Sequence, residues 1–327
     1  MVDKTIKAAF LFPGQGAQYP GMALDFLKSS KAAADLFALA SDAMGRDMEA
    51  LLRNSDAETL KRSDIAQPTV TLANLCAAAF LKERGLTPAC AAGHSLGEYA
   101  ALVSAGVVSP GDCLKLVVAR GKAMQATVEK IAKQSGGRDG GASADADSAP
   151  GMAAVLGMAP EQVEALVKSL GIADLYAANF NSLKQVVISG TAAALAAAQD
   201  KFKEAGAKRV LRLQVAGPFH SPFMAEAADA FGPALESVSF QDPALPLFSN
   251  VSGKAVSSGA EAKELALKQI TSPVRWIAEE SAIAALGIEA CLETGPGTVL
   301  QGLWRDSGNE APVFAAGKLE EIEALFN

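Results

Sequence analysis

A serine flanked by glycines constrains this chain more than any other feature. The motif G-H-S-L-G, residues 93–97, follows a short Ala-rich segment and precedes apolar residues at helical spacing that continue to Gly106. The pattern predicts a strand that turns sharply into a helix, with Ser95 Oγ projecting from the end of a sheet. The N-terminus of that helix favours negative charge beside the serine. We therefore predict that Ser95 is a nucleophile; the alternative is a glycine-rich turn with a helix-capping serine.

A serine nucleophile needs a base, and the 327 residues include only two histidines, His94 and His220. His220 lies in the segment GPFHSPF, residues 217–223, where prolines restrict the backbone and hold the side chain in place. His94 directly precedes Ser95, so its side chain is expected to point away from the serine. We predict His220 as the base and His94 as a structural residue, and a hydrogen-bonded loop histidine is the alternative for His220.

Two further polar residues, Gln15 and Arg120, have settings that suggest contact with a substrate. Gln15 lies in the turn F-P-G-Q-G directly after the apolar segment 6–12, which we predict to be a buried strand. It is a candidate second oxyanion donor beside the Leu96 N–H, although a plain Pro-Gly turn is also possible. Arg120 interrupts an apolar helical pattern, and a charge in such a setting needs a partner. It either binds a substrate carboxylate or forms a structural ion pair.

The periodicity of apolar residues indicates an α/β protein with an internal unit. We predict helices over residues 22–40, 65–84 and 111–131, and further strands over residues 245–250 and 290–294. The internal unit has predicted strands over 152–157, 175–181, 185–190 and 209–214, and helices over 160–170 and 192–205. Its order, β-α-β-β-α-β, is the ferredoxin-like arrangement. Residues 133–150, rich in Gly, Ser, Asp and Ala, are expected to form a flexible surface loop.

Composition narrows the classes of partner. A net charge of −7 argues against generic nucleic-acid binding. No apolar run reaches the length of a membrane span, and residues 8–12 are too short a run for a secretory signal. The four cysteines show neither C-x-x-C pairs nor a histidine at metal-ligand spacing. We expect a cytoplasmic protein with reduced, buried thiols, and with no metal, cofactor, nucleic-acid or membrane partner.

Several ordered motifs together resemble the malonyl-CoA:acyl-carrier-protein transacylases of fatty acid synthesis over nearly the whole chain. The matching segments are LFPGQGAQ (11–18), AGHSLGEYAAL (92–102), ARGKAMQ (119–125), NFNS (179–182), QVVISG (185–190), GPFHSPFM (217–224), QITSPVRW (269–276) and ETGPG (293–297). The resemblance implies an α/β fold with an α/β-hydrolase-like large subdomain over residues 1–126 and 216–327. Residues 127–215 would be an inserted ferredoxin-like (βαββαβ) small subdomain. The loop 133–150 is longer than the family pattern leads us to expect.

The resemblance also implies a role for individual residues. Ser95 would be the acylated nucleophile and His220 its base. Gln15 and the Leu96 N–H would form the oxyanion hole, and Arg120 would bind the free carboxylate of a malonyl group. No acidic residue between Ser95 and His220 has a distinctive setting, which argues against an ordinary hydrolase triad. The remaining implied residues are Gln269, whose backbone carbonyl would orient the histidine, and Met124, Asn179 and Asn181, which would bind substrate.

The activity implied by the resemblance is transfer of malonyl from malonyl-CoA to the phosphopantetheine thiol of acyl carrier protein, through a malonyl-serine intermediate. The product would supply fatty acid chain elongation. A serine hydrolase or thioesterase of a small acyl thioester is the first alternative, and a docking module with a degenerate site is the second. An acidic carrier protein needs a local basic surface on this chain. The alternative is that the basic residues that could form it are only a solvated helix face. The candidates for that surface are Lys201, Lys203, Lys208 and Arg209.

Overall fold

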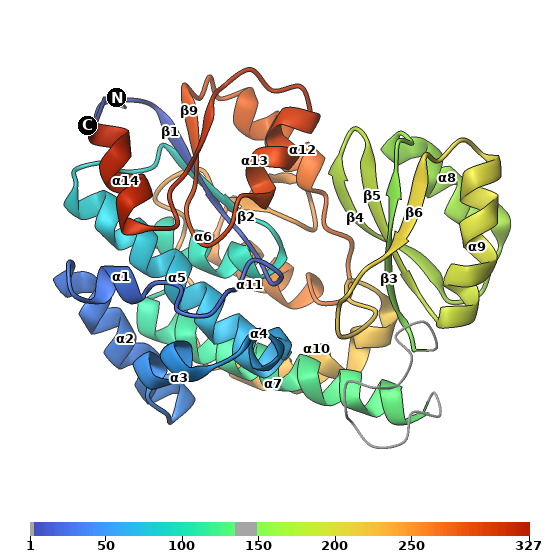
Figure 1. Cartoon of the computed structure of the whole chain (residues 1–327), viewed down its shortest axis with the longest axis horizontal. Helices are drawn as coiled ribbons and strands as arrows, with labels where there is room; N and C mark the ends of the chain where they lie inside the picture. Colours follow the sequence, from blue (N-terminus) through green and yellow to red (C-terminus); the bar gives the residue numbers. More distant parts are fainter. Residues whose placement is uncertain (1–2, 135–148) are drawn as a thin grey trace.

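The computed structural model of the chain describes residues 3–134 and 149–327, in which two four-stranded sheets organise the chain (Figure 1). One sheet is parallel, with the order β10-β9-β1-β2, and the other is antiparallel, with the order β4-β5-β3-β6. The parallel strands are β1 (Ala8–Phe12), β2 (Cys90–Gly93), β9 (Ala290–Glu293) and β10 (Val313–Ala315). The antiparallel strands are β3 (Gly151–Leu156), β4 (Leu175–Ser182), β5 (Gln185–Gly190) and β6 (Arg209–Arg212). A small ribbon pairs β7 (Phe248–Ser249) with β8 (Lys254–Ala255).

The parallel sheet is buried on both faces. Along β1, Phe10 and Phe12 belong to one hydrophobic core, which includes side chains of α5 (Ser63–Glu83), whereas Leu11 belongs to a second core. The second core includes side chains of α12 (Trp276–Ala284) and α13 (Val299–Asp306). Successive side chains of a strand point to opposite faces, so a sheet covered on both sides needs strands that are apolar throughout. This explains why residues 6–12 read as a continuous apolar run.

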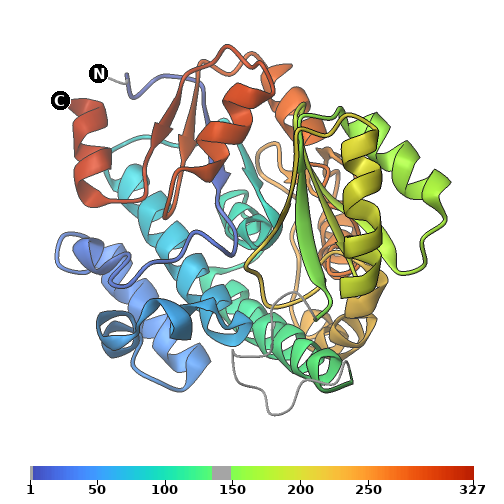
Figure 2. The same ribbon diagram turned by 45° about the vertical axis from the view of Figure 1, so that its right-hand side comes forward.

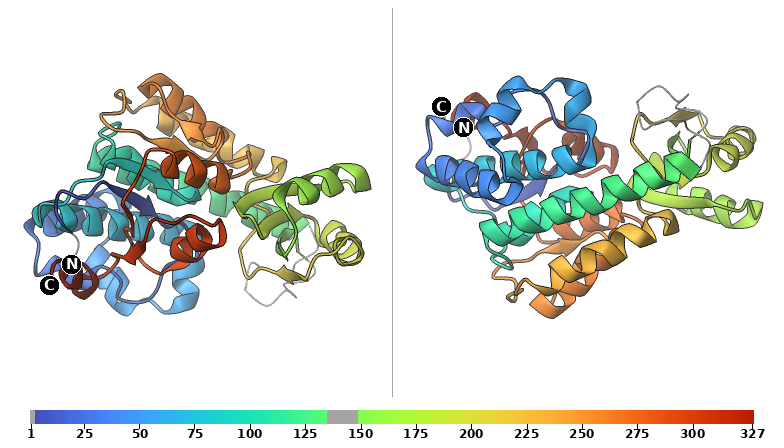
Figure 3. Two further views of the ribbon diagram at one scale, coloured as in Figure 1. Left: turned by 90° about the horizontal axis from the view of Figure 1, so that it is seen from above. Right: turned by 90° about the horizontal axis from the view of Figure 1, so that it is seen from below.

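Most other helices pack around the parallel sheet, and one of them reaches toward the antiparallel sheet. Figure 3 shows α7 (Pro110–Gln134) running along the molecule from one sheet region to the other. The remaining elements of this region are α1 (Leu24–Leu27), α2 (Lys31–Met44), α3 (Met48–Asn54), α4 (Ala57–Lys61), the 3-10 turn η1 (Ser95–Gly97), α6 (Glu98–Ser104), the 3-10 turn η2 (Pro222–Met224), α10 (Ala225–Glu236), α11 (Gly259–Lys268) and α14 (Leu319–Phe326).

The antiparallel sheet has the β-α-β-β-α-β order that the sequence predicts. Its helices α8 (Pro160–Leu170) and α9 (Ala192–Glu204) cover the face turned away from the parallel sheet (Figures 1 and 2). On β3, Val155 packs into the core under these helices, whereas Met152 and Ala154 belong to the main core on the other face. This alternation fixes the register of the sheet between two apolar layers.

One strand of the antiparallel sheet is hydrogen-bonded to the segment that precedes α12. The Phe180 N–H donates to the Val274 carbonyl at 2.8 Å, and the Val274 N–H donates to the Ala178 carbonyl at 2.8 Å. The outer edge of β4 is therefore tied by backbone bonds to the region around the parallel sheet.

Some predicted elements are wrong in their bounds. Residues 22–40 form two helices, because Ser30 starts a new one by accepting a hydrogen bond from the Ala33 N–H at 3.0 Å. The strand predicted over residues 245–250 is only Phe248–Ser249. The helices that were not predicted are α3, α4, α10, α11, α12, α13 and α14. Of the loop predicted over residues 133–150, residues 135–148 lie outside the described part of the chain.

The predictions from composition have separate outcomes. All four cysteines are free and buried, as expected. No helix within residues 3–134 and 149–327 is long and apolar enough to span a bilayer.

Candidate active site

Ser95 lies where β2 turns into η1 and α6, so the predicted strand–turn–helix is present. Its backbone is in the left-handed region, with a φ of 51°, which is uncommon for a residue that has a Cβ. The flanking glycines permit very close backbone contacts. A Cβ on Gly93 would lie 2.0 Å from the Gly97 carbonyl carbon, and a Cβ on Gly97 would lie 2.0 Å from the Phe12 oxygen. The turn thus requires glycine on both sides of the serine.

His220 meets Ser95 although 125 residues separate them in the sequence. The distance from Ser95 Oγ to His220 Nε2 is 2.7 Å. The Nδ1 atom of the same ring lies 3.0 Å from the Gln269 carbonyl oxygen and 3.1 Å from the Ser272 carbonyl oxygen. Carbonyls only accept, so Nδ1 carries the proton and Nε2 presents a lone pair to the serine hydroxyl.

The surroundings of His220 keep its imidazole neutral. The side chain is buried, and burial, followed by the nearby charge of Arg120, lowers the pKa of His220 to about 3. The ring is therefore unprotonated at neutral pH. A neutral imidazole with a fixed tautomer is the form that accepts a proton from a hydroxyl.

Arg120 projects from α7 and is buried among neutral partners. Its Nη1 donates to Gln67 Oε1 at 2.9 Å, its Nη2 donates to Gln269 Oε1 at 3.0 Å, and its guanidinium carbon lies 5.4 Å from the centre of the Tyr99 ring. No carboxylate of the described residues forms a direct ion pair with it, although the Glu98 carboxyl acts on its charge and bonds to the same Gln269 side chain. The guanidinium has five N–H donors, and the buried Nε has no acceptor. Donors remain for an anionic ligand.

The loop that contains Gln15 lies directly against the serine turn. A Cβ on Gly14 would lie 2.4 Å from the His94 oxygen and 3.5 Å from the Leu96 nitrogen. Within the described residues, the backbone N–H groups of Gln15 and Leu96 donate to no acceptor. The Gln15 side chain is turned toward Ser63, with 3.3 Å between Nε2 and Oγ. The backbone N–H is therefore the candidate oxyanion donor at position 15.

Met124 lies one helical turn after Arg120 on α7 and is buried. Its Sδ lies 3.1 Å from Gln67 Nε2, and Gln67 in turn accepts a hydrogen bond from Arg120. Met124 therefore belongs to the group of side chains that fixes the guanidinium.

Asn179 and Asn181 reach the site region from β4, and both are buried. Asn181 Oδ1 lies 2.8 Å from His94 Nε2, and the His94 ring packs edge-on against Trp276. The His94 side chain is thus engaged away from Ser95, in agreement with its predicted structural role. Asn179 lies at the backbone bridge between β4 and Val274.

Sequence reasoning missed several polar residues behind the serine. Asn250 Oδ1 accepts from the Ser95 N–H at 2.6 Å, and Glu98 Oε2 accepts from both the Asn250 N–H and Gln269 Nε2 at 2.9 Å. Burial raises the pKa of Glu98 to about 7. Glu98 and Gln67 are polar residues in apolar helical patterns, so the rule that selected Arg120 also finds them. Asn250 has no such local signal.

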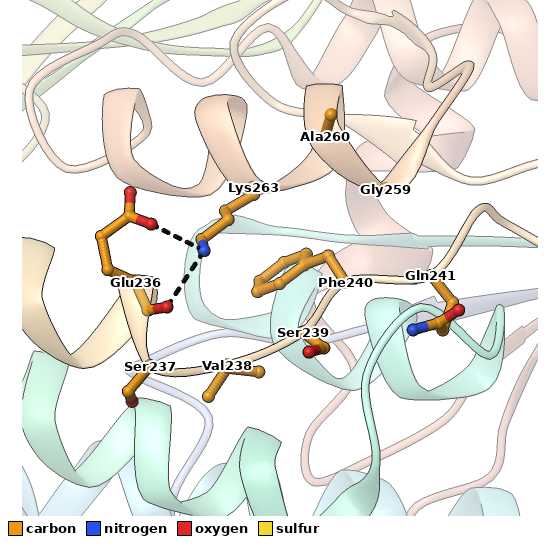
Figure 4. A pocket seen from close by; sticks show the side chains of 9 residues that line it. All are labelled: Glu236, Ser237, Val238, Ser239, Phe240, Gln241, Gly259, Ala260 and Lys263. Atoms are coloured by element: carbon orange, nitrogen blue, oxygen red, sulfur yellow. Dashed lines mark hydrogen bonds and ion pairs between the residues drawn. The ribbon is translucent and has the colours of Figure 1, made fainter.

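A separate hollow of about 420 Å³ opens between the end of α10 and the start of α11 (Figure 4). Its lining includes Val238 and Phe240, and Lys263 Nζ lies 2.8 Å from Glu236 Oε2 at its side. None of its lining residues belongs to the group around Ser95. The hollow is therefore distinct from the candidate active site.

Comparison with known proteins gives consistent matches over most of the chain. Residues 9–320 match the acyl transferase domain family. A malonyl CoA-acyl carrier protein transacylase of Bacillus subtilis is 36% identical over 321 residues, which cover 97% of this chain and 95% of the relative. The crystal structure of the transacylase of that name from Clostridium perfringens has a TM-score of 0.88 at 33% identity, over 98% of this chain and 96% of that one. A malonyl-transacylase in complex with a type II polyketide synthase acyl-carrier protein has a TM-score of 0.86 at 34% identity, over 98% of both chains.

Proposed function

The chain belongs to the acyl transferase domain family, among the malonyl CoA-acyl carrier protein transacylases, and from this premise we propose how its residues transfer a malonyl group. The enzyme is an acyltransferase that moves malonyl from malonyl-CoA to the thiol of acyl carrier protein. We infer that Ser95 holds the malonyl group between two half-reactions. The contact of 2.7 Å between Ser95 Oγ and the neutral His220 Nε2 carries this proposal.

In the first half-reaction, Ser95 Oγ attacks the thioester carbonyl while His220 Nε2 takes its proton. The oxyanion forms toward the free backbone N–H groups of Gln15 and Leu96. The C–S bond then breaks, and the departing CoA thiolate takes the proton from the imidazolium. Carbonyl acceptors at Nδ1 stabilise the imidazolium without an acidic partner, which explains how the site works without the acid of a hydrolase triad.

In the second half-reaction, the phosphopantetheine thiol of the carrier gives its proton to His220 Nε2 and attacks the malonyl ester. The C–O bond breaks, and Ser95 Oγ recovers the proton from His220. Water is the competing acceptor, so the burial of the His220 side chain favours transfer over hydrolysis.

Arg120 supplies the preference for a dicarboxylic acyl group. A buried cation without a direct ion-pair partner is costly, and the free carboxylate of malonyl would provide that partner. The planar guanidinium suits two parallel hydrogen bonds to a carboxylate. Met124, Asn179 and Asn181 would line the substrate site beside it, which is consistent with their burial on α7 and β4.

We infer two subdomains, an α/β-hydrolase-like one over residues 1–126 and 216–327 and a ferredoxin-like one over residues 127–215. The separate core under α8 and α9 and the strand order β4-β5-β3-β6 support the division. Residue 126 falls inside α7, so the core of the small unit begins at β3. We also propose a cytoplasmic protein that supplies fatty acid chain elongation, a role supported by its free thiols and by its family.

The nucleophile is tested by incubating the protein with malonyl-CoA labelled in the malonyl group, without carrier. The native protein should retain one covalent label on Ser95, and Ser95→Ala should retain none. Ser169→Ala, which changes an exposed serine on α8, is the matched control and should label normally. Covalent label retained by Ser95→Ala would refute the assignment.

The same incubation separates transfer from hydrolysis. A transacylase releases about one CoA per enzyme and then waits for the carrier thiol, whereas a thioesterase releases CoA continuously. The hydrolase alternative predicts that added carrier leaves the rate of CoA release unchanged. A docking module with a degenerate site predicts that no CoA is released at all.

A further inference from the structure

The backbone of Ser95 is held on both sides by side-chain amides from distant parts of the chain. Its N–H donates to Asn250 Oδ1 at 2.6 Å, and its carbonyl accepts from Gln269 Nε2 at 3.0 Å. A left-handed φ in a residue with a Cβ persists only where the surrounding structure holds it. These two amides are therefore the contacts that oppose relaxation of the serine turn.

Asn250 uses its whole side-chain amide in this position. Its Oδ1 accepts from Ser95, while its Nδ2 donates to the Gly93 carbonyl at 2.8 Å and to Glu279 Oε1 at 2.7 Å. Asn250 and Glu279 are completely buried. Both the oxygen and the nitrogen of the amide have partners, so the orientation of the amide is fixed. The amide thus links Gly93 to Ser95 across the turn.

The same network reaches the other members of the site. Glu98 Oε2 accepts from the Asn250 N–H and from Gln269 Nε2, both at 2.9 Å. Gln269 also accepts from Arg120 through its side chain and from His220 through its backbone. Asn250 and Gln269 are thus joined through one carboxylate and by a direct bond of 3.3 Å from Gln269 Nε2 to Asn250 Oδ1, although neither Asn250 nor Glu98 bonds to Ser95 Oγ or to the imidazole.

We propose that Asn250 is a positioning residue for malonyl transfer: its amide holds the left-handed Ser95 backbone so that Oγ faces His220 Nε2. The inference rests on the proposed role of Ser95 as the nucleophile. Without the amide, the Ser95 N–H loses its buried acceptor and the turn relaxes toward the right-handed region. Oγ then moves away from the base, while Arg120 keeps both of its amide partners.

The test is the rate constant for malonylation of Ser95, measured by rapid quench with labelled malonyl-CoA. In Asn250→Ala we expect this rate constant to fall about 100-fold, the effect of a misplacement of about 1 Å. The KM for malonyl-CoA should change less than about threefold, since the carboxylate site is unaltered. Gln301→Ala removes a buried side-chain amide on α13 that takes no part in the hydrogen bonds around Ser95. This control should lower the melting temperature and leave malonylation unchanged.

Isosteric variants keep the test usable if Asn250→Ala does not fold. Asn250→Asp retains the acceptor for the Ser95 N–H but faces the Gly93 carbonyl and Glu279 with a carboxylate oxygen, so malonylation should slow about tenfold. Burial raises the pKa of Glu279, so adding Glu279→Gln places a donor opposite that oxygen whatever the protonation of the carboxyl, and should recover part of the rate. A residue with a merely structural role would show no such recovery.

Two results would overturn the proposal. One is malonylation by folded Asn250→Ala within about threefold of the native rate. The other is an Asn250→Asp variant with the native rate, or one that Glu279→Gln does not improve. If the native protein itself carries no label on Ser95, the proposed function fails instead, so the two failures are distinguishable.

Discussion

Loops that follow the parallel strands carry Ser95 and Gln15, whereas a single strand of the antiparallel sheet carries Asn179 and Asn181. Ser95 and the Gln15 loop follow the neighbouring strands β2 and β1 at their carboxyl ends, which is where parallel sheets commonly bind ligands. From the antiparallel sheet, β4 supplies Asn179 and Asn181. In the proposed reaction, the first region supplies the backbone donors and the nucleophile, and the second region supplies two side chains at the edge of the substrate site.

The glycines of the two regions differ in how closely other backbone atoms approach them. Around Ser95, a Cβ on Gly93 or Gly97 would lie 2.0 Å from backbone atoms, and in the antiparallel region a Cβ on Gly190 would lie 2.4 Å from the Asp174 oxygen, whereas Gly171, at the end of α8, faces open space. The comparison teaches that the serine turn depends on close main-chain packing. Gly171 should tolerate a side chain better than the glycines of the serine turn, and substitutions at both places can break this distinction or sharpen it.

The largest contrast is expected between Gly97→Ala and Gly171→Ala. A Cβ at position 97 would lie 2.0 Å from the Phe12 oxygen, so we expect about 3 kcal/mol of destabilisation or more and at least about 100-fold slower malonylation. Gly171 has a φ of 57°, so alanine there should cost about 1 kcal/mol and leave the rate unchanged. Denaturant unfolding and rapid quench measure the two effects. Equal losses at both positions would remove the distinction.

The next effect is expected at Arg120. Arg120→Ala should lower kcat/KM for malonyl-CoA about 100- to 1,000-fold, because charge-assisted hydrogen bonds to a buried carboxylate are lost. The kcat/KM for acetyl-CoA, which has no free carboxylate, should fall less than about fivefold by the same reasoning. The kcat/KM of Arg120→Lys for malonyl-CoA should lie between that of the native protein and that of Arg120→Ala, since an ammonium does not present the planar pair of donors. Unchanged selectivity between the two substrates would exclude Arg120 from the carboxylate site.

The pH dependence tests the electrostatics of the same region. His220 must be neutral to act as base, so lowering the pH through its pKa of about 3 should abolish malonylation. Arg120→Ala removes a positive charge that lowers this pKa, and the acid limb should move to higher pH. An acid limb that does not move in Arg120→Ala would contradict this coupling.

Stability must be followed in parallel with the pH profile. The folded-state pKa of His220 lies below the unfolded value of 6.5, so the unfolded chain binds this proton first. The contribution of His220 to stability is therefore lost as the pH falls from that value toward about 3. Circular dichroism at each pH identifies the range in which rates refer to folded protein.

A smaller effect is expected on the β4 side. Asn181→Ala removes the hydrogen bond to His94 Nε2, which is worth about 1 kcal/mol, so kcat/KM should fall about fivefold. Steady-state transfer to the carrier measures it. A loss larger than about 100-fold would place the antiparallel sheet within the catalytic machinery and end the distinction drawn above.

The smallest effect is expected at the basic residues of α9. Lys201 and Lys203 are already paired with Glu204 and Asp200, at 2.9 and 3.4 Å. Exposed pairs contribute little, so charge reversal at both lysines should raise the KM for carrier protein only about two- to threefold. The KM for malonyl-CoA should not change. Equal changes in both constants would indicate that the carrier docks elsewhere.

Local patterns predicted much of the fold. The strand 185–190 and the helix 160–170 occur as β5 and α8 with the expected bounds, because each is a short apolar pattern between clear breakers. The contact between Ser95 and His220 followed from the motif and from the scarcity of histidines. The division of residues 22–40 was missed, although the capping serine at position 30 is a recognisable signal.

The hydrogen bonds that support the serine turn could not be predicted from local sequence patterns. Asn250 meets Ser95 across 155 residues, and Gln269 meets it across 174. Neither residue interrupts a periodic pattern of apolar residues. Such contacts arise only when the strands have paired and the loops have been brought together, so a single sequence carries no direct trace of them.

The backbone bridge between β4 and Val274 has a consequence for engineering this enzyme. Ser272, two residues before the bridge, supplies one of the carbonyls that fix the His220 tautomer. In a chimaera that takes its antiparallel sheet from another transacylase, a foreign strand would therefore pair with the segment that orients His220. Such a graft should keep the base oriented only when the donor strand pairs with Val274 in the native register.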